Sequence, residues 1–237
     1  MPFRVRCDPM SEHPAIILLT GGLDSSTVLA EASAAGRSCH ALSFRYGQRH
    51  EYELEAAASI AAHFDAVEHV VMDIDLGIFG GSALTTELEV PKDALDEGPS
   101  IPVTYVPARN TIFLSLALAH AEVRSAHEIW IGVNAIDYSG YPDCRPEYIE
   151  AFETMANLAT REGVQGGALK IVAPLAQLDK SQIVQRANVL GVPLQHTHSC
   201  YDPSDSGVPC GHCDACLLRA RGFSGAGVID PTLGRKV

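Results

Sequence analysis

Residues 15–26 read AIILLTGGLDSS, a short apolar run followed at once by two glycines, an aspartate and two serines. The apolar run predicts a buried strand over Ala15–Thr20, and the stretch Ser25–Ala35, which ends before Gly36, predicts a helix. Two glycines between a strand and a helix let the backbone approach an anion closely, and the helix N-terminus offers unpaired N–H groups. The stretch therefore predicts a phosphate-binding loop.

This loop differs from two common phosphate-binding motifs. It lacks the lysine and the spacing of a Walker A loop, and it is not a G-x-G-x-x-G fingerprint. Ser25 and Ser26 add hydroxyl donors, and Asp24 can cap the helix or reach a metal ion. A plain Gly-Gly turn capped by Asp24 is the structural alternative. The strand and the helix on the expected sides favour phosphate binding.

Short β-rich runs alternate with longer helical ones along the rest of the chain. Further strands are expected at residues 39–44, 67–72, 128–133 and 169–173, and helices at 50–64, 110–123, 147–161 and 180–190. This alternation predicts an α/β fold, with a parallel twisted sheet flanked by helices. Ligands of such sheets bind beyond the carboxyl ends of the strands. The segment 74–104, rich in Gly and Pro, predicts a long excursion or lid.

The 237 residues have room for one α/β domain with a small appendage. We expect a nucleotide- and substrate-binding domain over residues 14–194 and a C-terminal segment over 195–237. Hydrophobic residues make up 46% of the chain and charged residues 19%, which excludes wholesale disorder. The net charge of −12 argues against a nucleic-acid partner, because such a partner needs a basic face. With no long apolar run and no cleavage pattern near the start, we expect a cytoplasmic protein without membrane contacts.

Four of the seven cysteines follow one another closely near the end of the chain. Cys200, Cys210, Cys213 and Cys216 have the spacing C-x9-C-x2-C-x2-C. Two residues between thiolates let one turn present both sulfurs to one ion, and four such ligands satisfy tetrahedral Zn²⁺. Ligation of an iron–sulfur cluster and four free thiols are the alternatives. With four sulfurs and no open coordination position, we expect a structural metal ion that activates no water.

Two further segments carry groups suited to a binding site. The segment 105–110, YVPARN, opens the apolar helix; Pro107 suits the first helical turn, and Arg109 would lie near the nucleotide phosphates. The loop 134–145 offers amide, carboxylate, hydroxyl, aromatic and guanidinium groups, which can stack on a heterocycle and bind its exocyclic amine. Cys144 in this loop could be a nucleophile, but a packed small side chain is the favoured interpretation.

Taken in order, these motifs resemble the 7-cyano-7-deazaguanine synthase family of the PP-loop ATP pyrophosphatases. The resemblance rests on TGGLDSS, SFRYGQRH, YVPARN, DYSGYPDCR, LDKSQIV and the four terminal cysteines. It covers about residues 15–223. Thr20 stands where the superfamily usually has serine, and Asp179 where a small hydroxyl residue is common.

The resemblance implies an enzyme that uses ATP and ammonia to turn 7-carboxy-7-deazaguanine into the 7-cyano base in queuosine biosynthesis. It implies one structural Zn²⁺ per chain, Mg²⁺ with ATP, and a homodimer. The ATP-binding residues would be Leu19, Thr20, Gly21, Gly22, Leu23, Asp24, Ser25, Ser26, Thr27, Val28 and Leu29. The catalytic residues would be Asp24, Arg109 and Lys180. The substrate-binding residues would be Asp137, Tyr138, Ser139, Gly140, Tyr141, Asp143 and Arg145.

Two rival functions remain at the level of the sequence. Another PP-loop enzyme, such as a tRNA thiolase or an amidotransferase-type synthetase, would share the first loop, although the acidic composition speaks against tRNA. A zinc-ribbon binding module without catalysis would not need an intact Gly-Gly-x-Asp-Ser loop or so long a βαβ scaffold.

Overall fold

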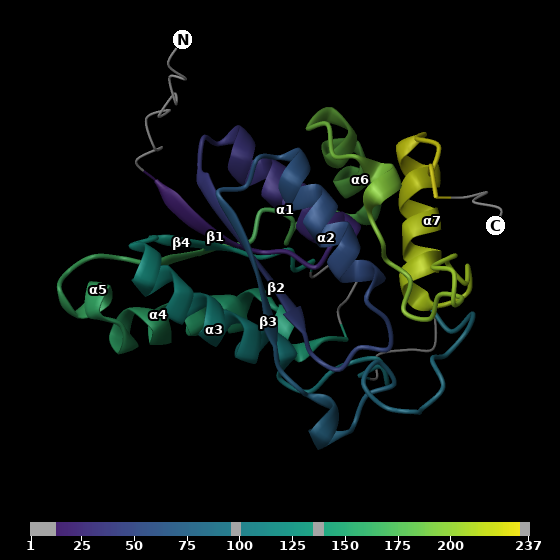
Figure 1. The fold of residues 1–237 in the computed structure, drawn as a ribbon, viewed down its shortest axis with the longest axis horizontal. Coiled ribbons are helices and arrows are strands. Elements are labelled where there is room, and N and C mark those ends of the chain that lie inside the picture. The colour runs from purple at the N-terminus through teal and green to yellow at the C-terminus, as the bar shows by residue number, and fades with distance from the viewer. Residues whose placement is uncertain (1–12, 96–100, 135–139, 233–237) are drawn as a thin grey trace, which may run out of the picture.

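The computed structural model describes residues 13–95, 101–134 and 140–232 (Figure 1). The strands are β1 (Pro14–Leu18), β2 (Ser38–Arg45), β3 (Glu68–Asp73), β4 (Glu128–Trp130) and β5 (Lys170–Val172). The helices are α1 (Leu23–Ala34), α2 (Tyr52–His63), α3 (Arg109–Arg124), α4 (Pro146–Ala159), α5 (Arg161–Val164), α6 (Lys180–Val189) and α7 (Asp214–Ala226). Short 3-10 turns are η1 (Gly77–Phe79), η2 (Pro142–Cys144) and η3 (Leu194–His196). Each strand and long helix expected from the sequence is present, with somewhat shifted ends.

The five strands form one parallel sheet in the order β3-β2-β1-β4-β5. From β1 the chain runs outward through β2 to β3, and it then returns past β1 to build β4 and β5. The order therefore reverses between β1 and β4, which pair side by side at the centre. At such a switch point the loops after the two strands leave in opposite directions, and a crevice opens at their carboxyl ends.

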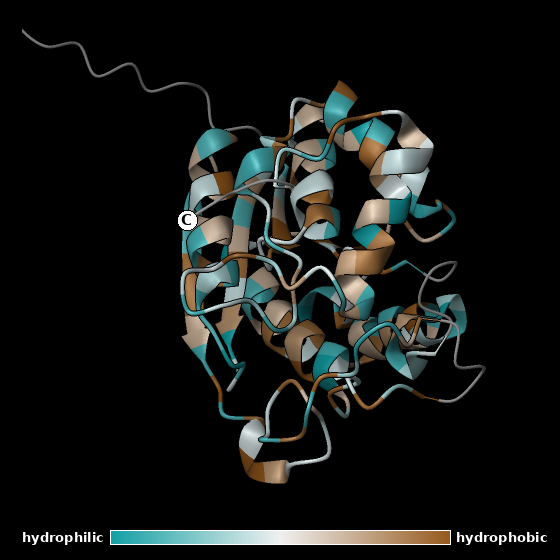
Figure 2. Cartoon of the chain, turned by 90° about the vertical axis from the view of Figure 1, so that its right-hand side faces the viewer, coloured by the Kyte–Doolittle hydropathy of each residue, from teal (hydrophilic) through white to brown (hydrophobic). Residues whose placement is uncertain are grey.

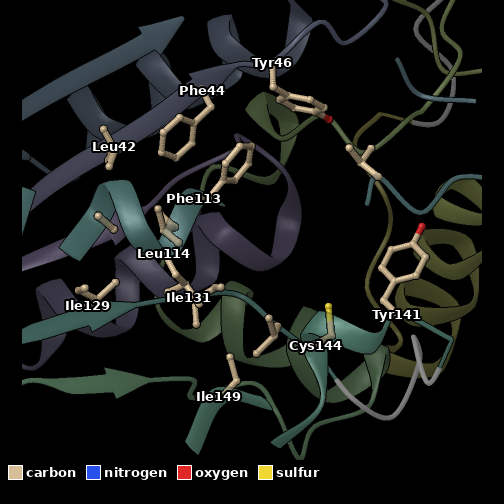
Figure 3. Packing of buried hydrophobic residues seen from close by; sticks show 14 of the residues in the cluster. Leu42, Phe44, Tyr46, Phe113, Leu114, Ile129, Ile131, Tyr141, Cys144 and Ile149 are labelled. Atoms are coloured by element: carbon tan, nitrogen blue, oxygen red, sulfur yellow. The ribbon is translucent and has the colours of Figure 1, made fainter. Parts of the chain in front are cut away.

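Helices cover both faces of the sheet, which confirms the predicted fold class (Figure 1). The alternation within β1 is the reason: Ile16 faces α3 and α4, whereas Ile17 faces α1, α2 and α6. Figure 3 shows the cluster on the α3 side, where the rings of Phe44 and Phe113 stack with centres 4.0 Å apart. This cluster continues to the carboxyl ends of the strands, so a packed core supports the loops there.

Helix α7 lies within the C-terminal segment, for which the sequence predicted no helix. Its interior glycines weaken the helical pattern, since glycine disfavours helices. The structure gives the reason for them: a Cβ at Gly222 would lie 2.4 Å from Cγ of Lys180, and one at Gly225 would lie 2.2 Å from Oγ of Ser181. The glycines therefore allow α7 to pack closely on α6. Phe223 of α7 is 2% exposed and belongs to the core.

The described part of the excursion 74–104 packs against the rest of the molecule. Leu76, Ala83 and Leu84 are buried in the core. Nζ of Lys92 lies 2.7 Å from a carboxylate oxygen of Asp202, so the excursion also contacts the cysteine-bearing segment. The excursion carries η1, the short helix at the bottom of Figure 2, whose apolar residues are coloured brown. That this segment acts as a lid stays a prediction.

None of the helices in the described ranges has the length and apolarity needed to cross a bilayer.

Candidate active site

A cavity of about 200 Å³ opens at the switch point, beyond the carboxyl ends of β1 and β4. The loop after β1, the residues after β4, the first turn of α3 and the C-terminal segment all contribute to its walls. From these elements the lining includes Thr20, Gly22, Asp24, Ser25, Arg109, Gly132, Asn134, Tyr141, Lys180, His198, Tyr201 and Arg219. The structure thus brings the predicted catalytic residues Asp24, Arg109 and Lys180 to one cavity.

The loop after β1 has a conformation that needs glycine. Gly21 has a φ of +79°, and a Cβ there would lie 2.2 Å from the carbonyl oxygen of Glu53 on α2. The Oγ atoms of Thr20 and Ser25 lie 3.0 Å apart, and the Thr20 N–H donates to Oγ of Ser25. The close approach of α2 therefore holds the loop tightly, with its hydroxyl groups at the cavity.

The predicted nucleotide loop divides into two parts in the structure. Thr20, Gly22, Leu23, Asp24 and Ser25 line the cavity, and the first N–H groups of α1 have no acceptor within the helix. The remaining predicted residues are buried around or behind the loop: Leu19, Gly21, Ser26, Thr27, Val28 and Leu29. The Ser26 hydroxyl donates to the carbonyl oxygen of Gly22, and the Thr27 hydroxyl to that of Leu23. These two hydroxyls therefore support the helix start.

Lys180 and Asp24 form an ion pair within the cavity. Nζ of Lys180 lies 3.0 and 2.8 Å from the two carboxylate oxygens of Asp24, across 156 residues of sequence. The side chains are 11% and 21% exposed. Lys180 opens α6 behind a capping box made by Asp179 and Gln182. This explains why aspartate can replace the small hydroxyl residue that is common at position 179: its carboxylate accepts the N–H of Gln182 and fixes the start of the helix.

Arg109, Tyr46 and Glu53 form a second polar group at the cavity. Cζ of Arg109 lies 5.9 Å from the centre of the Tyr46 ring. Burial raises the pKa of Glu53 to about 7, although the charge of Arg109 acts in the opposite direction. Burial, followed by the charge of Glu53, raises the pKa of Tyr46 to about 12. The helix begins at Arg109, one residue before the predicted start, and Pro107 lies outside its first turn because Ala108 takes a left-handed φ of +54°.

The predicted substrate loop is partly described. Tyr141 lines the cavity, and its hydroxyl lies 2.9 Å from that of Thr104. Asp143 is buried, where its Oδ2 accepts the backbone N–H of Asn110 at 3.0 Å. Arg145 is exposed and donates to the carbonyl oxygen of Pro142. Gly140 precedes Tyr141 in a turn, and Asp137, Tyr138 and Ser139 lie outside the described residues.

Cys144 lines the cavity as a packed thiol (Figure 3). It is 7% exposed, and its sulfur accepts from Nδ2 of Asn110 at 3.3 Å. Burial raises the pKa of this thiol to about 11, so it is not a thiolate at neutral pH. Since the thiolate is the nucleophilic form, the packed interpretation is favoured.

The four terminal cysteines converge on one point. The sulfurs of Cys200, Cys210, Cys213 and Cys216 lie within 4.8 Å of one another. Backbone N–H groups point at them: those of Cys210 and Asp202 donate to the sulfur of Cys200 at 3.2 and 3.4 Å. Such donors stabilise thiolates, so the donor set fits a metal ion such as Zn²⁺. The segment also supplies His198, Tyr201 and Arg219 to the cavity wall.

The sequence analysis missed several lining residues, among them Glu53 and Gly132. Glu53 follows the SFRYGQRH stretch by three positions, and this spacing was its only signal. Gly132 follows β4, and a Cβ there would lie 3.1 Å from the backbone nitrogen of Ser25. No local pattern reveals such a contact between segments far apart in the chain.

The chain matches known proteins over nearly its whole length. The family model "Queuosine biosynthesis protein QueC" matches residues 14–227. The 7-cyano-7-deazaguanine synthase of Kineococcus radiotolerans is 59% identical over 222 residues, which are 93% of this chain and 97% of that protein. The synthase of Geobacter sulfurreducens is 61% identical over 218 residues, 92% of this chain and 91% of that protein.

The likeness to a solved structure is much weaker. The NMN synthetase of Francisella tularensis is 16% identical, with a TM-score of 0.48 over 92% of this chain and 88% of that one. The high identity to the synthases and the family match decide the assignment. The chain belongs to the family of the queuosine biosynthesis protein QueC.

Proposed function

We propose that this chain converts 7-carboxy-7-deazaguanine and ammonia to 7-cyano-7-deazaguanine, with ATP as the activating substrate. The observation that carries the proposal is the cavity at the switch point. There a glycine-containing loop, a helix N-terminus and the Asp24–Lys180 pair meet. The chain is about 60% identical to proteins named 7-cyano-7-deazaguanine synthase.

The chemistry needs activation because a carboxylate resists attack by ammonia. A substrate carboxylate oxygen attacks the α-phosphorus of ATP, and pyrophosphate leaves. Ammonia then displaces AMP to give the amide. A second transfer of AMP to the amide oxygen makes that oxygen a leaving group, and loss of AMP with two protons from nitrogen yields the nitrile. One site serves both steps because each presents an oxygen to the same α-phosphate.

The lining groups have distinct tasks in this scheme. The first N–H groups of α1 and the Ser25 hydroxyl bind phosphate oxygens. Lys180 and Arg109 supply positive charge where negative charge develops on the phosphates. Asp24, the carboxylate nearest the loop, would hold the Mg²⁺ that accompanies ATP, and this ion would neutralise charge on the phosphates. The predicted substrate loop, residues 137–145, binds the deazaguanine ring.

The four cysteines hold one Zn²⁺ in this proposal. Four thiolates complete a tetrahedral shell, so the ion has no position for substrate. Its task is to hold the C-terminal segment in place as a wall of the cavity. None of the described cysteines forms a disulfide bond, as is typical of the reducing cytoplasm.

We also propose a homodimer without a nucleic-acid partner. Ile78 and Phe79 of η1 are 72% and 76% exposed, and Ile101 is 57% exposed. Apolar groups gathered on one excursion are typical of a covered surface. Sedimentation of the wild-type chain should show a dimer, and the Phe79→Ser variant should dimerise more weakly. In a mobility-shift assay, the protein should not retard tRNA.

The test of the activity is one incubation with the acid, Mg²⁺–ATP and ammonium, followed by mass spectrometry of bases and nucleotides. The nitrile should appear only when both ATP and ammonium are present, and the ratio of AMP to nitrile counts the activations. Asp24→Ala should abolish product, whereas the exposed Asp65→Asn should not change it. If the acid stays unchanged while ATP binds, the substrate assignment is wrong.

A further inference from the structure

Glu53 is a carboxylate of the cavity that the scheme above leaves without a task. It belongs to the first turn of α2, whose backbone packs on Gly21 of the phosphate-binding loop. Its side chain is half-buried and lines the cavity. Within the described residues, no N–H or O–H group donates a hydrogen bond to this carboxylate. A carboxylate withdrawn from water normally has such donors, so one without them is available to a ligand.

Among the described residues that line the cavity, the other carboxylate is that of Asp24, and it already accepts hydrogen bonds. Both of its oxygens accept from Nζ of Lys180. Glu53 has no such partner, and the cation that acts on it is Arg109. Further titratable groups line the same cavity: Asp24 and Lys180 of α1 and α6, Tyr46 after β2, Arg109 of α3, and His198 and Tyr201 of the C-terminal segment. Of the two carboxylates in the described lining, Glu53 is therefore the one whose oxygens accept no hydrogen bond.

We propose that Glu53 binds ammonium in the cavity and takes the proton that ammonium must lose before its nitrogen can attack. This inference rests on the proposed function. Ammonium is the main form in neutral water, and it has no lone pair. A carboxylate attracts it as a cation and is also the proton acceptor.

The step balances in atoms and charge. A proton moves from ammonium to the Glu53 carboxylate, and the freed lone pair forms the C–N bond at the adenylated carboxyl carbon. The C–O bond to AMP breaks, and a second proton passes from nitrogen to the departing AMP phosphate. The products are the amide, AMP and neutral Glu53, which returns its proton to water before the next turnover.

Burial supports this role because an efficient base titrates near the working pH. The pKa of Glu53, raised to about 7 by burial, lies in that range. Amide formation in the wild type should therefore rise with pH up to about 7 and then level off. Without the carboxylate, the rate should keep rising into the alkaline range, where free ammonia replaces ammonium.

The test is Glu53→Gln, which keeps the shape of the side chain and removes the base. Two nucleophiles are compared: ammonium, and hydroxylamine, which is largely neutral at neutral pH and needs no deprotonation before attack. With ammonium the rate of amide formation should fall about 100-fold. Hydroxamate formation should stay near the wild-type rate. So should the exchange of pyrophosphate into ATP that depends on 7-carboxy-7-deazaguanine. Glu55→Gln, an exposed neighbour on α2, is the matched control.

The outcomes separate the two proposals. If 7-carboxy-7-deazaguanine does not stimulate the exchange of pyrophosphate into ATP in the wild type, the proposed function itself is overturned. Normal exchange with an unchanged ammonium rate in Glu53→Gln overturns only the role of Glu53. Equal losses with ammonium and hydroxylamine also overturn it, because they indicate that Glu53 only positions the substrate.

Discussion

At the carboxyl ends of the strands, charged side chains surround a cavity. At the amino ends, charged side chains instead form ion pairs with one another. At the amino ends, Nδ1 of His40 and Nε2 of His120 lie 2.8 and 3.0 Å from one oxygen of Glu68, and Arg124 pairs with the other oxygen. Burial alone would raise the pKa of Glu68, but hydrogen bonds from His40 and Arg124 lower it. Both oxygens of this carboxylate are occupied.

The carboxyl end differs in its backbone more than in its charges. The first N–H groups of α1 have no acceptor within the helix, and glycines at positions 21 and 132 let loops approach closely. The comparison teaches that His, Glu and Arg side chains can satisfy one another by ion pairs, even where their geometry suits a metal. Unpaired donors and room for a ligand mark the active end.

The largest effect should come from removing the metal that we assign to the carboxyl end. Structural Zn²⁺ contributes about 10 kcal/mol or more to small zinc domains. Cys213→Ala should lose the ion, unfold the C-terminal segment and abolish activity. Elemental analysis should find one zinc per chain in the wild type and in Cys39→Ala, a buried cysteine outside the cluster. A Cys213→Ala protein that retains zinc and activity would contradict this role.

The next largest effect should come from replacing a lysine at the carboxyl ends of the strands, with a lysine at the amino ends as the comparison. Lys180→Met should lower the rate of nitrile formation about 1,000-fold, roughly 4 kcal/mol, because it removes a charge that acts on the phosphates. Lys170→Met changes an exposed lysine at the amino end of β5 and should leave the rate unchanged. Equal losses in the two variants would break the comparison. Thermal unfolding of both proteins checks that they fold.

A smaller effect should follow from a buried ion pair at the cavity wall. Nε of Arg219 lies 2.7 Å from Asp230, and the two side chains are 8% and 2% exposed. Asp230→Asn should lower the free energy of unfolding by about 3 kcal/mol, since it leaves the guanidinium buried without its partner. Denaturant unfolding measures the change.

The same pair has a defined pH dependence. Burial alone would raise the pKa of Asp230, but the hydrogen bond and charge of Arg219 prevail and lower it. A lowered pKa means that its contribution is present above the ordinary aspartate pKa of about 3.9 and is lost as pH falls through the lower folded value. Asp230→Asn should therefore flatten the acid limb of the stability curve. An unchanged acid limb would show that other carboxylates govern it.

The smallest effect should come from the amino end. Glu68→Gln should lower the free energy of unfolding by about 1 kcal/mol, because the pairs that it weakens are partly exposed. The rate of nitrile formation should stay at the wild-type value. Elemental analysis of the wild type should find no metal besides the zinc of the cysteines, so none at the Glu68 cluster. A loss of activity in Glu68→Gln would place function at both ends.

The sequence alone determined the parts that depend on neighbouring residues. The strand–glycine–helix pattern at 15–35, the C-x2-C-x2-C spacing and the alternation of strands and helices each have a local cause, and each predicted its element. Within the predicted site, Thr20 and Ser25 lie where the loop pattern indicated. The resemblance extends the predicted nucleotide loop to Leu29, and only the structure shows that residues 26–29 are buried, because a sequence does not show which residues of a helix face the core.

The tertiary structure decided which distant residues meet. Lys180 reaches Asp24 because Gly222 leaves room for the lysine stem beside α7, and Glu53 faces the cavity because Gly21 lets α2 approach the loop. These contacts depend on close packing between segments far apart in the chain, and no periodicity or spacing within a segment records them. The helix over Asp214–Ala226 was missed for the same reason, since its glycines favour packing on α6 at the expense of helix propensity.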